Sequence, residues 1–458
     1  MPNLRIYHLN DLAPEIRAVT FAKCSRSPLA FDEIARELTQ EKASEFHEKW
    51  VVGYGHSSVA EHAVLSLAME NVSILATKII EDNRLASYTE KSSRYQIFDH
   101  EKIYKPKNLL ESKYKDTYEN AVNKLMDTYL KIAPIMKTFI EKKYPAPEGV
   151  EPRVHQVCLK GKICDNIRYL LPVATLTNLG MTINARNLEH AIRKLLSNPL
   201  DEAKEIGAEL KKVGLAVCPT LIKYADRNDY LVGAAKTLEN KTREIFANID
   251  AAKSDDVELV EYDKDAVEKI LTAILYRFSK YSYKQSRERA KLLSVEQREQ
   301  LLEKLHGNME KFDWPIRELE HVTYTFDIAM DYGAFRDVQR HRICTQTNQR
   351  LTAELGFSTP PEIIEAGVQK EYLEAISIAE NAWRQIAADF PDEAQYVLPL
   401  AFRKRTLMTM NLRELHHFIK LRSGKAGHFS YRRIAQKCFE KIKQVHPELA
   451  QYIRVTLD

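Results

Sequence analysis

Three adjacent side chains, Arg340, His341 and Arg342, offer the most distinctive chemistry in this sequence. Arginine presents a planar, permanently charged fork that suits phosphate, and histidine adds a hydrogen-bond donor or a stacking surface. Three successive residues cannot share one face of a helix or strand, so together they can contact several parts of one extended ligand. Taken alone, the same triplet is more often a solvated basic patch at a helix end.

An altered copy of the surrounding segment lies far upstream and gives the triplet more weight. Arg84 takes the place of Arg342, and the spacing from His62 to Arg84 nearly equals the spacing from His321 to Arg342. A later stretch also occurs in both halves, as residues 166–190 and 393–417. Matches that follow the same order along the chain indicate an internal duplication.

Length and composition set the domain count. A chain of 458 residues with 44% hydrophobic and 29% charged residues is large enough for two or three globular domains. The duplication favours two, and we expect a first repeat in residues 1–235 and a second in residues 257–458. The polar stretch 236–256 is interpreted as the linker between them. A net charge of +4 is too small to argue for a nucleic-acid partner.

Three further features bear on location. No apolar stretch reaches 18 residues without a charge, so no membrane span is expected. The N-terminal segment carries acidic residues and lacks a continuous apolar core, so it is not interpreted as a signal peptide. The six cysteines show no CxxC spacing, which fits reduced thiols in the cytoplasm.

The elements that must position these residues are mostly helices. Apolar spacing and strong helix formers predict helices in residues 27–50, 111–143 and 294–312. Short β-rich pieces predict strands at residues 4–9, 257–262 and 321–330. The resulting class is α+β with helix in the majority. The first copy is longer than the second between its signature segment and its later matched stretch, which we interpret as an added helical excursion.

Other kinds of site have less support. His56, Glu61 and His62 suggest zinc, but their spacing does not match the HxxEH or HExxH ligand pairs, so no metal is expected. The chain contains no GxGxxG, P-loop or GxSxG motif. Their absence argues against a Rossmann dinucleotide domain, an NTPase and an α/β hydrolase.

Together these segments resemble the flavin-dependent thymidylate synthases. That family carries a GHxSxxEH stretch, an RHRx7S signature that continues into S-x-R-Y, and a late helical segment containing an asparagine and an arginine. The first copy matches the GHxSxxEH stretch as Gly55, His56, Ser58, Glu61 and His62. It matches the end of the signature as Glu90, Ser92, Arg94 and Tyr95.

The two copies depart from the family at different places. The first copy has Asp82, Asn83 and Arg84 where the second copy keeps the intact triplet. The second copy instead lacks the end of the signature, where it has Asn348, Arg350, Thr352 and Ala353. The resemblance thus covers most of the chain as two diverged units, which implies tandem helix-rich α+β domains with antiparallel or mixed sheet.

Two separate arginines of the family are divided in the same way. The arginine that contacts substrate falls on Arg168 in the first copy and on Gln395 in the second. The late arginine falls on Arg422 in the second copy and on Leu195 in the first. Because family enzymes are homotetramers with sites between subunits, these complementary losses imply a homodimer that acts as a pseudo-tetramer. Complete sites would then form only where a first repeat meets a second.

The resemblance implies reductive methylation of dUMP to dTMP, with methylenetetrahydrofolate and NADPH as cosubstrates and FAD as cofactor. The residues expected to bind substrate are Glu90, Ser92, Arg94, Arg168, Arg340 and Arg422. The residues expected to bind FAD are His62, His321, Arg340, His341, Arg342, Asn411 and His417.

Some departures keep other readings open. Asp337 stands where the family usually offers glutamine to the substrate, and His417 replaces a flavin-contacting asparagine. Gly427, His428 and Phe429 stand where the family commonly has Ala-Gln-Trp. The alternatives are a related flavoenzyme that modifies another pyrimidine nucleotide, and a non-catalytic scaffold that binds nucleotide or flavin.

Overall fold

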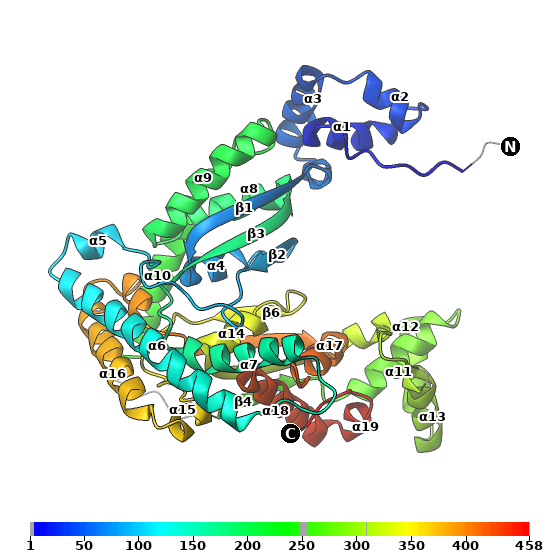
Figure 1. Ribbon diagram of the computed structural model, residues 1–458. Coiled ribbons are helices and arrows are strands. Elements are labelled where there is room, and N and C mark those ends of the chain that lie inside the picture. Colours follow the sequence, from blue (N-terminus) through cyan, green and yellow to red (C-terminus); the bar gives the residue numbers. More distant parts are fainter. Residues whose placement is uncertain (1–3, 248, 250–254, 308, 458) are drawn as a thin grey trace. The chain divides into compact units, whose positions relative to one another are not determined.

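The computed structural model describes residues 4–247, 249, 255–307 and 309–457. It forms two compact units, each built around one antiparallel sheet (Figure 1). Unit 1 comprises residues 1–122, 173–250 and 386–396, and unit 2 comprises residues 123–172, 251–385 and 397–458. Each unit therefore contains a segment from the opposite half of the sequence.

The sheet of unit 1 has three antiparallel strands in the order β1, β3, β2, namely Val64–Ser73, Leu176–Asn184 and Ala86–Glu90. Side chains alternate along β3, with Leu179, Met181 and Ile183 buried while Gly180 and Thr182 are exposed. The helices α4 (Ile74–Ile80) and α8 (Ala185–Leu196) pack on the sheet, and α9 (Asp201–Val217) packs on α8 (Figure 1). One face of the sheet is thus covered and the other stays open.

Short helices precede this sheet in unit 1. They are α1 (Pro14–Cys24), α2 (Phe31–Arg36), α3 (Gln40–Phe46), the π-helical turn η1 (His47–Gly53) and the 3-10 turn η2 (Ser57–His62). Helices therefore fill most of the predicted helical region 27–50. The strand predicted for residues 4–9 is wrong, because that segment has no regular structure. Its apolar side chains Leu4 and Ile6 are each 87% exposed, so no partner surface stabilises an extended pairing.

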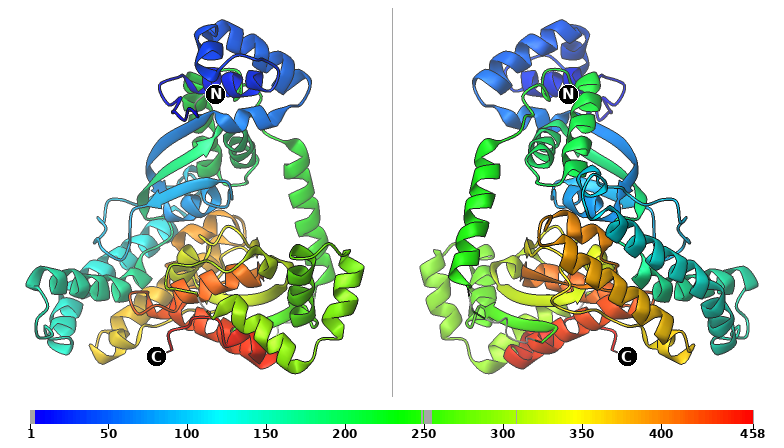
Figure 2. Two further views of the ribbon diagram at one scale, coloured as in Figure 1. Left: turned by 90° about the vertical axis from the view of Figure 1, so that its right-hand side faces the viewer. Right: turned by 90° about the vertical axis from the view of Figure 1, so that its left-hand side faces the viewer.

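The sheet of unit 2 repeats this arrangement with one added edge strand. Its order is β4, β5, β7, β6, formed by Val257–Tyr262, Thr323–Asp331, Arg403–Asn411 and Thr345–Asn348. The strands predicted at 257–262 and 321–330 are confirmed as β4 and β5. The helix α18 (Phe429–Val445) packs across both of these strands (Figure 2).

The elements come in the same order in both halves of the chain: a β-strand, a short helix, a second strand, long helices, a third strand and a final helix. In the second half these elements include η4 (Arg317–His321), α14 (Tyr332–Val338), α15 (Pro361–Glu365), α16 (Gln369–Ile386), η5 (Glu393–Val397) and α17 (Leu412–Arg422). The side chains of Asn184 and Asn411 cap α8 and α17 in the same way. The repeated order and the matching sheets confirm the helix-rich α+β class.

The remaining helices include the excursion predicted for the first copy. Helix α6 (Lys115–Lys143) has 29 residues against 18 in α16, and α7 (Pro152–Ile167) and the turn η3 (Arg168–Leu170) follow it. The other helices are α5 (Lys107–Leu110), α10 (Asp229–Ile245), α11 (Ala266–Arg277), α12 (Tyr283–Lys291), α13 (Val295–His306) and α19 (Pro447–Ala450). The first part of the predicted linker 236–256 is thus helical, and its residues 248 and 250–254 lie outside the described residues.

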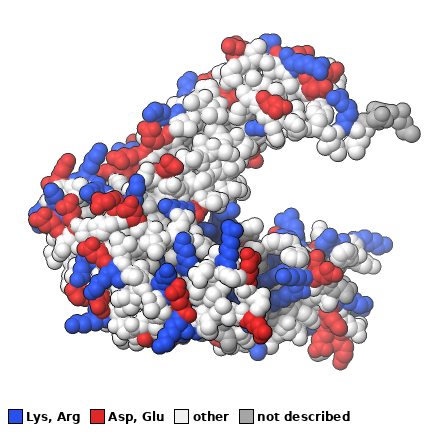
Figure 3. All heavy atoms as spheres, in the orientation of Figure 1, with Lys and Arg blue, Asp and Glu red and all other residues white. Residues whose placement is uncertain are grey.

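The surface carries both signs of charge intermixed, as the face in Figure 3 shows, in keeping with a net charge of +4. Within the described ranges, no helix combines the length and apolar character that crossing a membrane requires. None of the six cysteines, all of which the structure describes, forms a disulfide, and four of them are buried: Cys164, Cys218, Cys344 and Cys438. Burial raises the pKa of the Cys164 thiol to about 11.

Candidate functional site

The triplet lies in unit 2 just after α14, where the chain turns from that helix toward β6. The side chain of Asp331 starts α14 by accepting a hydrogen bond from the backbone N–H of Ala334 at 2.8 Å. Arg340 is exposed, His341 is 4% exposed and Arg342 is half-buried. The three side chains therefore take three different environments, and their contact with an extended ligand stays a prediction.

His341 is held by two charged neighbours from α17. Arg422 donates its Nε–H to His341 Nε2 at 2.9 Å, and the Nδ1 of His341 lies 2.7 Å from Glu414 Oε1. Arginine has no acceptor, so Nε2 accepts, and Nδ1 must carry the proton that is donated to Glu414. Burial also lowers the pKa of His341 and favours this neutral form. Because both ring nitrogens are occupied, His341 can offer a ligand its ring but no further hydrogen bond.

Arg168 and Arg422 converge on one carboxylate. The Nη1 of Arg168 lies 4.0 Å from Asp337 Oδ2, and the Nη1 of Arg422 lies 3.8 Å from Asp337 Oδ1. Both distances exceed the hydrogen-bond range, so the contacts are electrostatic and leave donors for a stronger acceptor. Burial lowers the pKa of Arg422, while Asp337 opposes that effect. The two arginines therefore form a cationic pair whose charge Asp337 partly neutralises.

Arg168 is the most buried of these cations, at 2% exposure. Its Nε and Nη2 have no hydrogen-bond partner among the described residues. A methyl group added at Gly333 would lie 3.3 Å from Arg168 Nη2 and 3.1 Å from Asp331 Oδ1, so glycine is needed for the close approach of backbone and guanidinium. Buried donors without hydrogen-bond partners raise the free energy of the folded state.

His417 lies beside the triplet on α17. Its ring stacks on Trp314 with centroids 4.9 Å apart and lies 5.4 Å from the ring of His341. Burial lowers the pKa of His417. Asn411, at the start of the same helix, uses its Oδ1 to accept the N–H of Glu414 at 2.8 Å. The capping role of Asn411 is structural, and its expected contact with cofactor stays a prediction.

His428 has a structural role in unit 2. Its Nε2 donates to the backbone carbonyl of Asp165 at 3.1 Å, and its Nδ1 accepts from the N–H of Ser430 at 3.2 Å. Its ring is fully buried. The departure from the family pattern at this position therefore anchors the start of α18.

The end of the signature lies in unit 1, at the C-terminal end of β2. Lys78 Nζ donates to Glu90 Oε2 at 2.9 Å and also bonds Glu81, and all three side chains are buried. The hydroxyl of Thr77 donates to Glu90 Oε1 at 3.2 Å. This network fixes the orientation of the Glu90 carboxylate.

Ser92 and Arg94 follow in the turn after β2. Ser92 Oγ accepts the backbone N–H of Arg94 at 3.1 Å, and the guanidinium of Arg94 lies 5.9 Å from the centre of the Tyr95 ring. Both residues are half-buried. Glu90, Ser92 and Arg94 thus share one unit, whereas Arg168, which belongs to the same sequence repeat, lies in unit 2 with Arg422.

The two Glu-His pairs are used alike in both repeats. Glu61 pairs with Arg186, and Glu320 pairs with Arg413, whose Nη1 lies 2.8 Å from Glu320 Oε1. Each arginine is the second residue after the capping asparagine of its helix. That shared spacing is a signal the sequence analysis missed, as it missed Lys78 and Glu414.

The histidines of these pairs have different surroundings. His62 is exposed and stacks on Phe21 with ring centroids 4.7 Å apart, and His321 is exposed. No group of three or more His, Cys, Asp or Glu side chains in the described part of the chain could hold a metal ion. The expected contacts of His62 and His321 with cofactor stay predictions.

Comparisons with known proteins agree with the repeated architecture. The family model described as thymidylate synthase complementing protein matches residues 9–220 and again residues 258–448. A UPF0159 protein from Chlamydia muridarum is 33% identical over 485 aligned residues, which cover 98% of this chain and 91% of that protein. A flavin-dependent thymidylate synthase from Clostridium tetani is 29% identical over 214 residues, or 46% of this chain and 82% of that protein.

A solved structure of a flavin-dependent thymidylate synthase from Helicobacter pylori, complexed with FAD and dUMP, also matches. It covers 44% of this chain and 100% of its own, at 21% identity and a TM-score of 0.34. The two matched regions of the family model confirm the duplication and the resemblance inferred from the motifs. The chain belongs to the thymidylate synthase complementing protein family and carries two tandem copies of the family unit.

Proposed function

We propose that this protein is a flavin-dependent thymidylate synthase. It would convert dUMP to dTMP, taking the methylene group from methylenetetrahydrofolate and reducing equivalents from NADPH. The observation that carries the proposal is the convergence of Arg168 and Arg422 on one point in unit 2. A buried and a partly exposed guanidinium at one point form a site for a small anion, and the phosphate of dUMP is such an anion.

The nucleotide phosphate would lie beside Arg168 and Arg422, next to the Asp337 carboxylate that faces them. Arg168 is held by its close packing against Gly333 with its Nη1 toward Asp337, and Arg422 is fixed by its bond to His341. Arg340 lies close enough to Arg422 to lower that group's pKa, so it adds to the positive potential. Charge-assisted bonds to a dianion orient the substrate, which is a large part of what such an enzyme must do.

Glu90, Ser92 and Arg94 are the other residues proposed to hold dUMP. The Lys78 and Thr77 bonds keep the Glu90 carboxylate in one orientation. Arg94 would add a further charge to the phosphate, and Ser92 would add a hydroxyl donor.

The residues of unit 2 also fit a flavin cofactor. Arg340 and Arg342 supply charge for its diphosphate, and His417 together with the ring of His341 supplies flat surfaces for its aromatic parts. His62, His321 and Asn411 stay proposed contacts. FAD, when bound, supplies the redox chemistry that no side chain here possesses, while the protein binds and orients.

The division of family residues between the two sequence repeats supports shared sites in a homodimer. A mixing experiment tests this. Arg94→Ala removes a proposed substrate contact of the first repeat, and Arg342→Ala removes a proposed cofactor contact of the second. Each purified variant should therefore be inactive. If sites combine repeats of different chains, co-refolding the two variants restores part of the activity. If both repeats of a site come from one chain, the mixture stays inactive.

The activity itself is tested by incubating the protein with FAD, NADPH, methylenetetrahydrofolate and dUMP and separating the products by chromatography. Formation of dTMP that needs all four compounds is the expected result. Flavin that binds and is reduced by NADPH without any dTMP would contradict the proposed substrate. Protein that binds no flavin at all would favour the non-catalytic scaffold.

One observation favours a second candidate, a flavoenzyme acting on another pyrimidine nucleotide. Asp337 stands where the family usually offers glutamine to the substrate, and an ionised carboxylate only accepts hydrogen bonds, so it favours a base other than uracil that offers a donor. The same assay with UMP and dCMP in place of dUMP separates the candidates. Product from either compound at a higher rate than from dUMP would favour the second.

A further inference from the structure

Helix α10 in unit 1 has an apolar side that no part of the structure covers. The structure describes all 17 residues of α10, and none of them is buried. Large apolar side chains of this helix and of the residue after it are 38% to 78% exposed: Tyr230, Leu231, Leu238, Ile245 and Phe246. Single apolar residues on a surface are ordinary, but a cluster on one helix marks a contact surface.

Little in unit 1 stabilises α10. The preceding helix α9 also has 17 residues and buries five of them. In α10 the side chain of Asn228 caps the start, and two exposed ion pairs, Glu239–Arg243 and Lys241–Glu244, support the second half. Exposed pairs of this kind contribute little, because most helical stability in proteins comes from packing an apolar face. The apolar side of α10 therefore needs a partner.

The apolar residues of α10 have a symmetric order. Leu231, Leu238 and Ile245 recur at seven-residue intervals, which places them on one side of the helix. Tyr230 and Phe246 stand eight residues before and eight residues after Leu238. The apolar pattern is thus the same in both directions from Leu238. An antiparallel copy of α10 centred on Leu238 would match it.

The size of this surface is sufficient for a specific contact between two copies. Five large apolar side chains bury on the order of 500 Å² in each copy, or about 1,000 Å² in total. A specific interface needs about that area. Gly233, Ala234 and Ala235 add little bulk, so two such helices can approach closely.

We propose that α10 is a homodimer contact, in which it packs antiparallel on α10 of a second copy with Leu238 at the two-fold axis. A two-fold contact uses the same surface on both copies, and the pattern of α10 is complementary to itself. Leu231 then faces Ile245 of the second copy, and Leu238 faces Leu238. The contact goes beyond the proposed reaction, because it needs neither substrate nor cofactor.

Sedimentation equilibrium of the full chain tests the contact. The wild type should be a dimer at micromolar concentration. Leu238→Lys removes the central apolar contact and places two like charges at the axis, so the dimer dissociation constant should rise about 100-fold. Asn240→Lys, which adds the same charge to the opposite side of α10, should leave it unchanged. A monomeric wild type, or equal dissociation constants in the two variants, would overturn the proposal.

A mixing experiment tests the register. Leu238→Glu should separate the copies as Leu238→Lys does. An equimolar mixture of the two variants should form heterodimers, because opposite charges then meet at the axis. A mixture that stays monomeric would contradict the antiparallel arrangement centred on Leu238. Both positions tested in α10 are exposed, so the replacements leave the packing of unit 1 intact.

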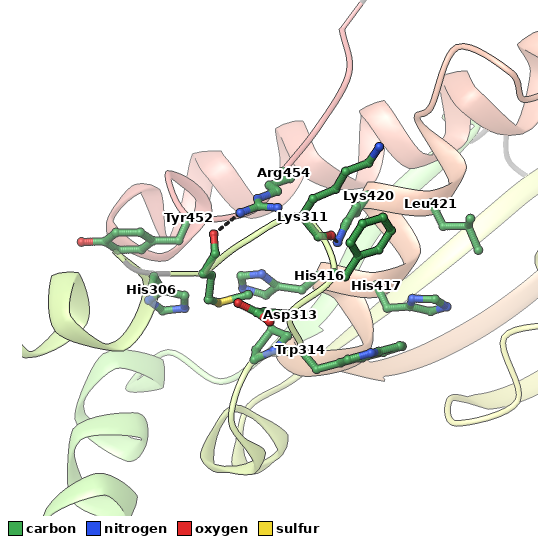
Figure 4. Close-up of a pocket in the computed structure, with 13 residues that line it drawn as sticks. His306, Lys311, Asp313, Trp314, His416, His417, Lys420, Leu421, Tyr452 and Arg454 are labelled. Carbon is green, nitrogen blue, oxygen red and sulfur yellow. Dashed lines mark hydrogen bonds between the residues drawn. The ribbon is translucent and has the colours of Figure 1, made fainter.

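The contact is separate from the residues proposed to bind dUMP and FAD, since none of them lies in α10. A cavity of about 380 Å³ beside α17 in unit 2 (Figure 4) is lined by His417 and so belongs with the proposed cofactor contacts. Formation of dTMP by a protein whose association ignores Leu238→Lys would contradict only the α10 contact. A dimer that responds as expected but forms no dTMP would contradict only the proposed reaction.

Discussion

The triplet Arg340–Arg342 and its counterpart Asp82–Arg84 show how one backbone arrangement can support two different uses. In unit 2, His341 bridges Glu414 and Arg422 on a neighbouring helix. In unit 1, Asn83 turns back and donates to the carbonyl of Ile80 at 2.8 Å on its own helix. In unit 2 the histidine of the triplet thus fixes the side chains of Glu414 and Arg422. In unit 1 the Asn83 amide bonds only to the backbone of its own helix.

The neighbours of the two segments differ in the same sense. Asp82 pairs with Lys194, and Leu195 is buried at 1% exposure where the second repeat has Arg422. Unit 1 instead buries its cation elsewhere, as Lys78 between Glu81 and Glu90. Each repeat therefore has a buried ionic network at a different place in the shared fold.

The largest expected effect is a loss of stability when the buried ionic network of Lys78, Glu81 and Glu90 in unit 1 is broken. Lys78→Met leaves two buried carboxylates without their cation, which should cost about 3–5 kcal/mol of unfolding free energy. Urea denaturation followed by circular dichroism measures it. Lys194→Met is the control, because its pair with Asp82 is partly exposed and should contribute about 0–1 kcal/mol. A loss below about 1 kcal/mol in Lys78→Met would show that the network contributes little.

The second prediction compares Arg422 with Leu195. Arg422→Ala removes one charge of the cationic pair and the hydrogen bond to His341, which should raise the dUMP dissociation constant about 100-fold, or about 3 kcal/mol. Leu195→Ala should instead destabilise unit 1 by about 2–5 kcal/mol through the cavity it leaves. Titration calorimetry with dUMP measures the affinities. Equal effects of both changes on dUMP affinity would remove the distinction between the two repeats.

The third prediction concerns Asp337. Asp337→Gln removes the carboxylate that faces both arginines, so the dissociation constant for dUMP should fall about tenfold. Ile79→Gln, at the matching position of the first repeat, should leave it unchanged. Equilibrium dialysis with labelled dUMP measures both. Weaker dUMP binding in Asp337→Gln would mean that the carboxylate positions the arginines and does not compete with the ligand.

The smallest expected effect is on the pH dependence of stability, to which His416 of the second repeat contributes. Burial lowers its pKa to about 3, so the unfolded chain takes up a proton below about pH 6.5 that the folded chain refuses. Stability should therefore fall as the pH drops, by about 1 kcal/mol between pH 6.5 and 5.5 from this group. His416→Phe should lose less over this range in urea denaturation. An identical loss in variant and wild type would contradict the assignment.

Much of the fold followed from local patterns. Apolar periodicity predicted α6, and β-rich composition predicted β4 and β5, because both signals lie in the local sequence. The same composition failed for residues 4–9, whose apolar side chains Leu4 and Ile6 have no surface to bury them. The duplication was visible because repeated order does not depend on contacts.

The residues of the candidate site were only partly predictable. Arg168 and Arg422 were found from the resemblance, but the position of Asp337 facing both could not be derived from their separation along the chain. The occupied nitrogens of His341 depend on Glu414, which carries no motif of its own. The role of Lys78 was missed for the same reason, since a single lysine in an apolar helix gives no signal of its partners.

The sequence by itself determined that the chain is a duplication, which elements each copy forms, and which family residues each copy has kept. Those properties depend on residue order and local periodicity. Only the tertiary structure decided that Arg168 lies with the second repeat's residues in unit 2, and that the triplet's histidine has no free nitrogen. Both depend on long-range packing, which brings side chains together regardless of their distance along the chain.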